Sequence, residues 1–297
     1  MKNFLPFVVT VFVAIMLTAC HHTPDVPRFD HVIVVIEENH GYDEVIGSAN
    51  APYISQLAHG GALFTDAHGV IHPSQPNYLA IFSGSTQSVT NDDCLDNVTP
   101  YTTPNLAASL ISHHFTFKGY AQTMPSVGFE ECTYQTSTLT DAHLYARKHA
   151  PWVNWQGDQE NNIPTELSQL MTAFPKDFSQ LPTVSFVIPD MDNDMHNIGK
   201  PGDAAAVKRG DDWLKENLAT YATWAKTHNS LLIITFDEDD FKTVNHIPTI
   251  FYGAHVKPGL YNEKINHYNV LHTLEAMYGL PVEDKNEEAS ITDIWNK

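Results

Sequence analysis

The chain has 297 residues, of which 42% are hydrophobic, and a formal net charge of −19 from 35 Asp plus Glu against 16 Lys plus Arg. This composition excludes a disordered chain and suffices for one large domain with a buried core, or for two smaller ones. The acidic balance argues against nucleic acid or an anionic membrane surface as the main partner. An anionic substrate would need local positive charge at its site, which bound cations can supply.

The first residues have the pattern of a secretory leader. Lys2 precedes an apolar stretch, residues 4–17, that is too short to span a bilayer comfortably. The stretch ends in Leu-Thr-Ala-Cys, which resembles the lipobox of bacterial lipoproteins; the alternative is an ordinary cleaved leader with a chance cysteine. We therefore expect a signal peptide at 1–19, a lipidated Cys20 that anchors the chain in the bacterial cell envelope facing the periplasm or the exterior, a polar tether at 20–29 and a single folded domain at 30–297.

The two remaining cysteines, Cys94 and Cys132, form an even pair in a chain that we expect to be exported. Such pairs form disulfides in oxidising compartments, so we expect a Cys94–Cys132 bridge. A pair of thiolate metal ligands suits that environment less well.

Four short apolar runs predict buried strands, at residues 31–36, 183–188, 231–236 and 247–253. Between them, apolar residues at helical spacing predict helices at 203–228, 104–115 and 268–279. Strands that alternate with helices predict an α/β fold with a largely parallel central sheet and helices on both faces. The stretches 86–102 and 150–165 are expected to be long surface excursions.

Three of the buried strands run directly into metal-ligating side chains. Glu37, Glu38 and Asn39 follow the first strand, Asp190, Asp192, Asp194 and His196 follow the second, and Asp237 and Glu238 follow the third. Ligands of open α/β folds bind beyond the carboxyl ends of the strands. Because so many converging carboxylates repel one another, we expect a divalent metal cation there; oxygen and imidazole ligands suit several such cations and leave its identity and number open.

Ser74 lies where a helix is predicted to begin, with Pro76 in the first turn. A serine at this place can cap the helix, or it can be a nucleophile close to the positive end of the helix dipole. No G-x-S-x-G elbow surrounds it, which argues against a hydrolase triad. Activation by a metal fits better.

Six segments, in chain order, resemble the bacterial acid phosphatase and phospholipase C phosphoesterase family of the alkaline phosphatase superfamily. They are "VIEENHGYDEVIG", "HPSQPNYLAIFSG", "IPDMDNDMHNIG", "LLIITFDEDD", "IPTIFYGAHVKPG" and "INHYNVLHTLEAMYGLP". The similarity spans about residues 30–282. It implies an alkaline-phosphatase-like three-layer sandwich.

The resemblance also implies roles for individual residues. Ser74 matches the nucleophile, and the residues that match metal ligands are Glu38, Asn39, Ser74, Asp237, Glu238, Asp194, His196 and His267. Many relatives have asparagine at the position of Asp190, and Asp192 stands four residues before His196. Asp190 and Asp192 are therefore alternative candidates for one metal ligand. The residues that fit substrate binding are His72, Asn77, Lys148 and His149; the alternative for the last two is that they cap a helix. His246 could also bind metal, but a packed or surface histidine fits better.

The expected function is that of an exported, metal-dependent acid phosphatase that hydrolyses small-molecule phosphate monoesters through a phosphoserine intermediate. An alternative is a phospholipase C-type phosphodiesterase. The acyl chains of its lipid substrate would need an apolar wall, which the loops around Trp152 and Trp155 would supply. A third possibility is a non-catalytic lipoprotein that binds phosphate or a partner.

Overall fold

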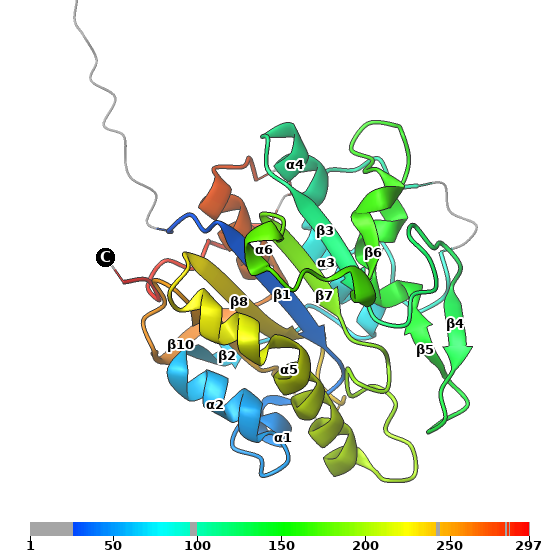
Figure 1. Cartoon of the computed structure of the whole chain (residues 1–297), viewed down its shortest axis with the longest axis vertical. Coiled ribbons are helices and arrows are strands. Elements are labelled where there is room, and N and C mark those ends of the chain that lie inside the picture. Colours follow the sequence, from blue (N-terminus) through cyan, green and yellow to red (C-terminus); the bar gives the residue numbers. More distant parts are fainter. Residues whose placement is uncertain (1–25, 96–99, 242–243, 283, 285, 297) are drawn as a thin grey trace, which may run out of the picture.

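The computed structural model describes residues 26–95, 100–241, 244–282, 284 and 286–296 (Figure 1). An eight-stranded sheet lies at the centre, in the order β10-β2-β9-β8-β1-β7-β3-β6. Its strands are β1 (His31–Glu37), β2 (Ala62–Ala67), β3 (Phe117–Ala121), β6 (Ser168–Leu170), β7 (Val184–Ile188), β8 (Ser230–Phe236), β9 (Thr249–Gly253) and β10 (Gly259–Ile265). β9 pairs antiparallel with both of its neighbours, whereas the other adjacent pairs are parallel. The predicted α/β class is confirmed.

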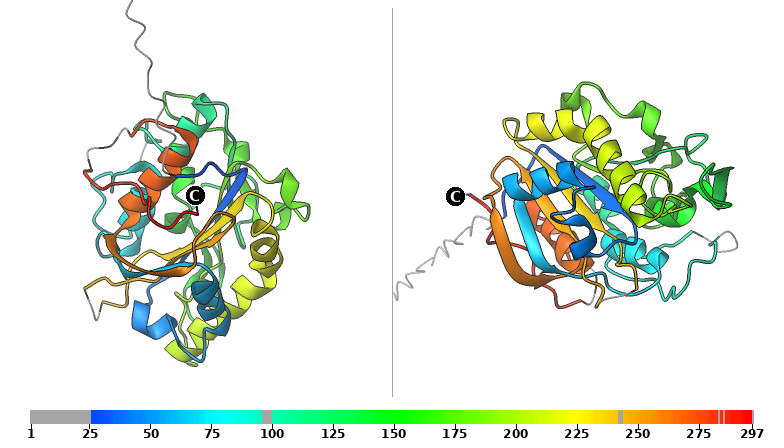
Figure 2. Two further views of the ribbon diagram at one scale, coloured as in Figure 1. Left: turned by 90° about the vertical axis from the view of Figure 1, so that its left-hand side faces the viewer. Right: turned by 90° about the horizontal axis from the view of Figure 1, so that it is seen from below.

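Helices cover both faces of the sheet and make three layers (Figures 1 and 2). One face carries α1 (Tyr42–Val45), α2 (Pro52–Gly60) and α5 (Asp203–Ala225); the other carries α3 (Ser74–Ser83), α4 (Leu106–Ser112) and α6 (His267–Tyr278). The helix predicted at 104–115 is shorter, because Asn105 caps it by accepting a hydrogen bond from the Ala108 amide. A hairpin of β4 (Thr133–Thr136) and β5 (His143–Ala146) lies beside the main sheet.

The short 3-10 helices lie in the connections around this hairpin and beyond it. They are η1 (Arg147–His149), η2 (Pro151–Trp155), η3 (Thr165–Leu167), η4 (Met171–Ala173) and η5 (Phe178–Gln180). η1 is the one that matters for the site, because it follows β5 directly and carries Lys148 and His149.

The middle of the sheet is apolar on both faces. Every residue of β7 and β8 is buried, as are the last six of β1. In the register, Val34 of β1 lies opposite Phe186 of β7 and Ile233 of β8. Because β8, β1 and β7 are neighbours and run in parallel, their carboxyl ends meet at one edge of the sheet.

Helix α3 begins close to this edge. Its ten residues are all buried, and it packs against α6. Ser74 is its first residue and Pro73 stands at the cap position. The order of the strands and the buried position of α3 together place Ser74 beside the strand ends that carry the acidic residues.

The folded domain begins earlier than predicted. Val26 and Phe29 are buried, and the Phe29 ring lies 5.7 Å from the Trp295 ring, centre to centre. Residues 26–29 therefore belong to the domain rather than to the tether, because their apolar side chains pack into the core. The expected signal peptide at 1–19 and Cys20 lie outside the described residues; within the described ones, no helix is long and apolar enough to cross a membrane.

The disulfide between Cys94 and Cys132 is confirmed, with the two Cα atoms 5.7 Å apart. The stretch 150–165 is exposed only in part, because residues 150–156 are buried, including Trp152 and Trp155, whereas residues 157–160 are exposed. Trp152 packs so closely on β3 that a Cβ atom at Gly119 would lie 2.1 Å from its ring. The expected apolar wall for acyl chains is therefore absent at these two tryptophans.

Candidate active site

The Ser74 hydroxyl lies among three acceptors at the end of the sheet. Its Oγ is 2.9 Å from Glu238 Oε1, 3.2 Å from Glu38 Oε2 and 3.4 Å from Asn39 Oδ1. The serine does not cap its helix, so that alternative is wrong. Asp92 takes over that task, since its Oδ1 accepts a hydrogen bond from the Gln75 amide at 2.9 Å.

The turn after β1 brings two neighbouring residues to Ser74. Asn39 adopts a left-handed backbone conformation with φ 51°, which asparagine tolerates better than most residues. The backbone N–H of Asn39 donates to Asp237 Oδ1 at 3.1 Å, so this hydrogen bond joins the ends of β1 and β8. The side chains of Glu38 and Asn39 can therefore both face the serine.

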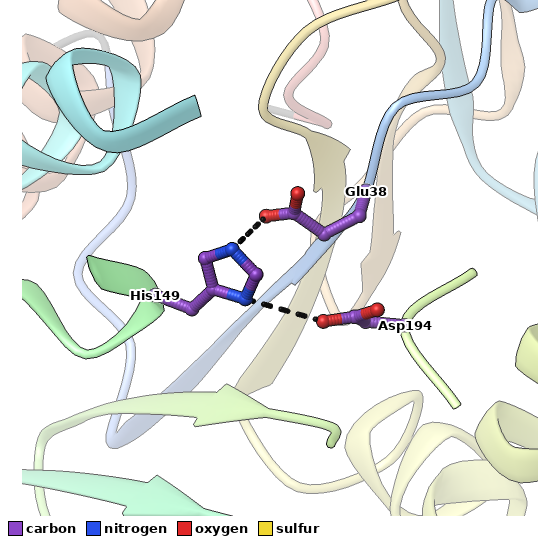
Figure 3. Close-up of side chains that lie close together, drawn as sticks. All are labelled: Glu38, His149 and Asp194. Atoms are coloured by element: carbon purple, nitrogen blue, oxygen red, sulfur yellow. Dashed lines mark ion pairs between the residues drawn. The ribbon is translucent and has the colours of Figure 1, made fainter. Parts of the chain in front are cut away.

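His149 lies between Glu38 and Asp194 (Figure 3). Its Nε2 is 3.2 Å from Glu38 Oε1 and its Nδ1 is 3.3 Å from Asp194 Oδ2. These contacts lack hydrogen-bond alignment, and within the described chain His149 Nε2 and Asp194 Oδ2 are buried without a hydrogen-bond partner. One ligand atom from each of the three residues lies within 4.8 Å of the others, a spacing that could hold a metal ion.

His267, the first residue of α6, is oriented in the way expected of a metal-binding histidine. Its Nε2 donates to the Asp237 carbonyl at 2.6 Å, so the proton is on Nε2 and the lone pair is on Nδ1. Among the described residues, neither His267 Nδ1 nor Asp237 Oδ2 has a hydrogen-bond partner, although both are buried. Such buried nitrogen and oxygen atoms fit a divalent cation.

The charges of the cluster work against one another in the absence of a cation. Burial raises the pKa of Asp237 to about 7 and, together with the neighbouring Asp237 charge, that of Glu238 to about 9. Burial also raises the pKa of Glu38 and Asp194 well above their usual range. Without a positive charge nearby, burial therefore favours the protonated form of these carboxyl groups, and a bound cation would favour the charged form.

Two histidines of the site are held neutral. Burial lowers the pKa of His196 and of His267 to about 4 in each case. Neutral imidazole is the form that binds metal. His196 lies beside the group of Figure 3, since its amide donates to Asp194 Oδ1 at 2.9 Å.

Asp190 and Asp192 do not join this cluster. Asp190 accepts hydrogen bonds from Thr123 Oγ1 at 2.8 Å and from Asn193 Nδ2 at 2.9 Å. Asp192 Oδ1 accepts from Ser137 Oγ and Asn197 Nδ2. Both carboxylates hold the turn that presents Asp194, and a part of either one in metal binding stays a prediction.

Asn77 is also placed differently from the expectation. Its Oδ1 accepts from the amides of Val70 and Ile71, and its Nδ2 donates to the carbonyls of Ile71 and Pro73. This uses the full hydrogen-bonding capacity of the amide. Asn77 therefore fixes the segment before Ser74 and has no group left for a substrate, which corrects its assignment as a substrate-binding residue.

Lys148 and His72 each contact a carboxylate that is hydrogen-bonded to Ser74 or to the residue after it. Lys148 Nζ is 2.6 Å from Asp92 Oδ2, and burial opposes its charge, but the nearby Glu38 and Asp92 carboxylates keep the pKa of Lys148 above its usual value. His72 contacts Glu238 through Nδ1 and lies 3.3 Å from Asp239 Oδ1 through Nε2. Both remain candidates for phosphate binding.

His246 packs rather than joining the cluster. It stacks on Tyr42 with ring centres 4.7 Å apart, and its Nε2 lies 3.0 Å from the Thr65 carbonyl.

Tyr78 is a site residue that the sequence analysis missed. Its hydroxyl donates to Glu38 Oε1, and its ring stacks on His149 with centres 5.0 Å apart. Tyr78 stands four residues after Ser74, so both side chains lie on one helix face. That spacing was the signal available in the sequence.

The fold is similar to that of solved structures in the alkaline phosphatase superfamily. The crystal structure of a protein in the alkaline phosphatase superfamily from Vibrio parahaemolyticus is similar, with a TM-score of 0.58 and 13% identity over 86% of this chain and 67% of that one. At this identity the similarity concerns the fold alone.

The sequence profile of the Phosphoesterase family matches residues 48–281, and the chain belongs to that family. It is 49% identical over 272 residues to the phosphatidylinositol-3-phosphatase of Mycobacterium tuberculosis, covering 91% of this chain and 84% of that relative. It is 28% identical to the phosphate-repressible acid phosphatase of Penicillium chrysogenum, covering 85% of this chain and 60% of that protein. The chain is thus a hydrolase of the phosphatase class.

The buried acids predict how stability depends on pH in metal-free protein. Folding raises the pKa of Asp237 and Glu238, so their protonated forms favour the fold and stability is lost as pH rises toward about 7 and about 9. His196 and His267 have lowered pKa values, so they cost stability only as pH falls from about 6.5 toward about 4. We expect the free energy of unfolding to decrease between about pH 6.5 and 9, and a bound divalent cation to remove that decrease.

Urea unfolding of chelated and cation-supplemented protein at several pH values measures this effect. A stability of the chelated protein that stays level or increases over this interval would contradict the assignment of buried, mutually repelling carboxyl groups.

Proposed function

We propose that the chain is a metal-dependent acid phosphatase that hydrolyses phosphate monoesters through a phosphoserine on Ser74. The observation that supports this most strongly is the hydrogen bonding of the Ser74 hydroxyl to buried carboxylates at the start of α3. A hydroxyl in this position has proton acceptors beside it and the positive end of a helix dipole behind it. The names of the fungal relatives support the acid phosphatase class.

In the first half of the reaction, Ser74 Oγ attacks phosphorus in line with the ester bond. The Oγ–P bond forms, the P–O bond to the alcohol breaks, and the alcohol leaves with a proton. The proton of Ser74 passes to a carboxylate, for which Glu238 Oε1 at 2.9 Å is best placed.

In the second half, the oxygen of a water molecule bonds to phosphorus and the Oγ–P bond breaks. Phosphate leaves, and a proton returns to the serine. Lys148, whose charge is maintained by Glu38 and Asp92, and His72 would hold phosphate oxygens near the serine.

The donor set fits a divalent cation, because several of its buried nitrogen and oxygen atoms have no hydrogen-bond partner within the described chain. The residues that would hold it are Glu38, Asn39, Asp237 and Glu238 near the serine, with Asp194, His149, His196 and His267 beside them. A cation bound there supplies positive charge that lowers the pKa of the Ser74 hydroxyl and balances the phosphoryl charge.

His149 changes role in this scheme. Its ring is 2% exposed and lies between two carboxylates, so we assign it to the cation rather than to the substrate.

The phospholipase C alternative loses its expected apolar wall, since Trp152 and Trp155 are buried in the core. A phosphate-binding protein without turnover is also disfavoured, because serine, proton acceptors and cation ligands are assembled together.

The mycobacterial relative is named a phosphatidylinositol-3-phosphatase, and the identity extends over most of both chains. This supports a monoester on an inositol ring as one substrate of the chain.

We also propose that the protein is exported and anchored through a lipidated Cys20, in keeping with the Cys94–Cys132 disulfide.

The anchor predicts a change in Cys20→Ser. Wild-type protein made in a bacterial host is expected to partition into the detergent phase with Triton X-114, and the variant into the aqueous phase, because only the wild type carries acyl chains. Equal partitioning of the two proteins would rule out the anchor.

The mechanism predicts the behaviour of Ser74→Ala. Loss of the nucleophile should lower kcat on p-nitrophenyl phosphate by about a thousandfold or more. The melting temperature and the metal content should change little, because the serine makes no cap. Ser112→Ala, at an exposed serine, is the control and should retain wild-type activity.

Chelation provides a second arm of the same experiment. Activity should disappear with the metal, as followed by elemental analysis, and return when a divalent cation is added. Wild-type turnover by Ser74→Ala would refute the phosphoserine, and full turnover by metal-free protein would refute the cation.

A further inference from the structure

A cavity of about 180 Å³ lies beside the active site, under the β4–β5 hairpin at the right-hand side of Figure 1. Its floor is formed by Gln75, the residue after Ser74, and its walls come from the disulfide, the hairpin and the turn after β7. The residues that line it are Gln75, Asp92, Cys94, Leu95, Cys132, Thr133, Ala142, His143, Ala146, Arg147, Lys148 and Met191.

Lys148 connects the cavity to the reacting centre. Its side chain lines the cavity, and its Nζ lies 2.6 Å from Asp92 Oδ2, while the other oxygen of Asp92 accepts a hydrogen bond from the backbone N–H of Gln75, the residue after Ser74. An ester whose phosphorus lies against Ser74 and whose oxygens contact Lys148 therefore has this space within reach of its alcohol group.

The walls are held in place by covalent and hydrogen bonds. The Cys94–Cys132 disulfide joins the loop before residue 95 to the start of the hairpin. The Gln75 side chain donates to the carbonyls of Asn91 at 3.0 Å and Asp93 at 2.9 Å, and Asp92 bridges the Gln75 amide and Lys148. The cavity is thus preformed next to the nucleophile, as small-molecule sites usually are.

The lining divides into an apolar part and a polar part. Leu95, Ala142, Ala146 and Met191 offer carbon surface, whereas Asp92, His143 and Lys148 offer groups that accept or donate hydrogen bonds. The volume is close to the roughly 150 Å³ cavity that accepts one benzene molecule. A six-membered ring with C–H groups on its face and hydroxyls on its edge matches both size and chemistry.

We propose that this cavity binds the leaving alcohol of the substrate and selects a hydroxylated six-membered ring. The inference rests on the proposed phosphatase function and names the part of the site that reads the alcohol. The ring face lies against Ala142 and Ala146, and its hydroxyls bond to Asp92 and His143.

A larger groove, lined in part by His72, is the competing location. It has a volume of about 890 Å³ and is reached past His72. Glu263 and Glu288 are among the residues that line it. These two carboxylates face one lysine, Lys264, whereas the lining of the cavity has one carboxylate, Asp92, with Arg147 and Lys148, so the cavity suits an anionic ester better.

Two matched substitutions distinguish these locations. Ala142→Phe fills the proposed cavity at a partly exposed hairpin position, and Ala289→Phe narrows the groove at an exposed position. The proteins are assayed as purified, with equal metal content and intact disulfide, on myo-inositol monophosphate, cyclohexyl phosphate and ethyl phosphate.

For Ala142→Phe we expect kcat/KM to fall about tenfold or more on both ring esters and to stay within about twofold on ethyl phosphate. Ala289→Phe should alter none of the three. An equal effect of Ala142→Phe on all three esters, no effect on any, or a ring-specific loss in Ala289→Phe would overturn the assignment. Absence of turnover of every ester by the wild-type protein would overturn the phosphatase itself, and the subsite with it.

His143→Ala tests the recognition of hydroxyls. It should lower kcat/KM for the inositol ester and leave kcat/KM for the cyclohexyl ester unchanged; equal losses on both esters would overturn the polar part of the assignment.

Ala142→Phe is also assayed on phosphatidylinositol 3-phosphate in detergent micelles. A loss on this lipid that parallels the loss on the soluble ester assigns the cavity to lipid head groups as well, and a loss restricted to the soluble ester assigns it to free polyol phosphates.

Discussion

The burial of several carboxyl groups around one serine is the interaction on which the rest of the structure depends. Glu38, Asp194, Asp237 and Glu238 lie at the ends of three adjacent parallel strands, and each has a raised pKa because it is removed from water. Such a cluster is costly unless protons or cations neutralise it. The same cost makes it an effective binding site for positive charge and, through that charge, for a phosphate ester.

The surrounding elements keep this cluster in one geometry. Tyr78 bonds to Glu38 and packs on His149, Asn77 holds the segment before Ser74, and Asp92 caps the helix while pairing with Lys148. Residues 74–78 therefore supply the nucleophile and much of its support within about one turn of a buried helix. A rigid supporting shell of this kind is what a precise catalytic geometry requires.

Much of the fold could be predicted from the sequence, because its buried strands are continuous apolar runs and the two cysteines of its folded domain form a single pair. The convergence of the strand-end acids also followed from parallel pairing alone. The functions of Asn77, Asp190 and Asp192 did not, because a polar side chain that supports a turn has the same sequence signature as one that binds a ligand. His149 was placed with the substrate because only the folded chain brings it between Glu38 and Asp194.

The covalent step at Ser74 is the central claim, and trapping it is the most direct test. Metal-loaded protein is mixed with a phosphate monoester and quenched in acid within milliseconds, and its peptides are analysed by mass spectrometry. The mechanism predicts a phosphoryl group on Ser74 that disappears when substrate is exhausted. Rapid turnover with no phosphorylated residue, or with the phosphoryl group on another side chain, would contradict it.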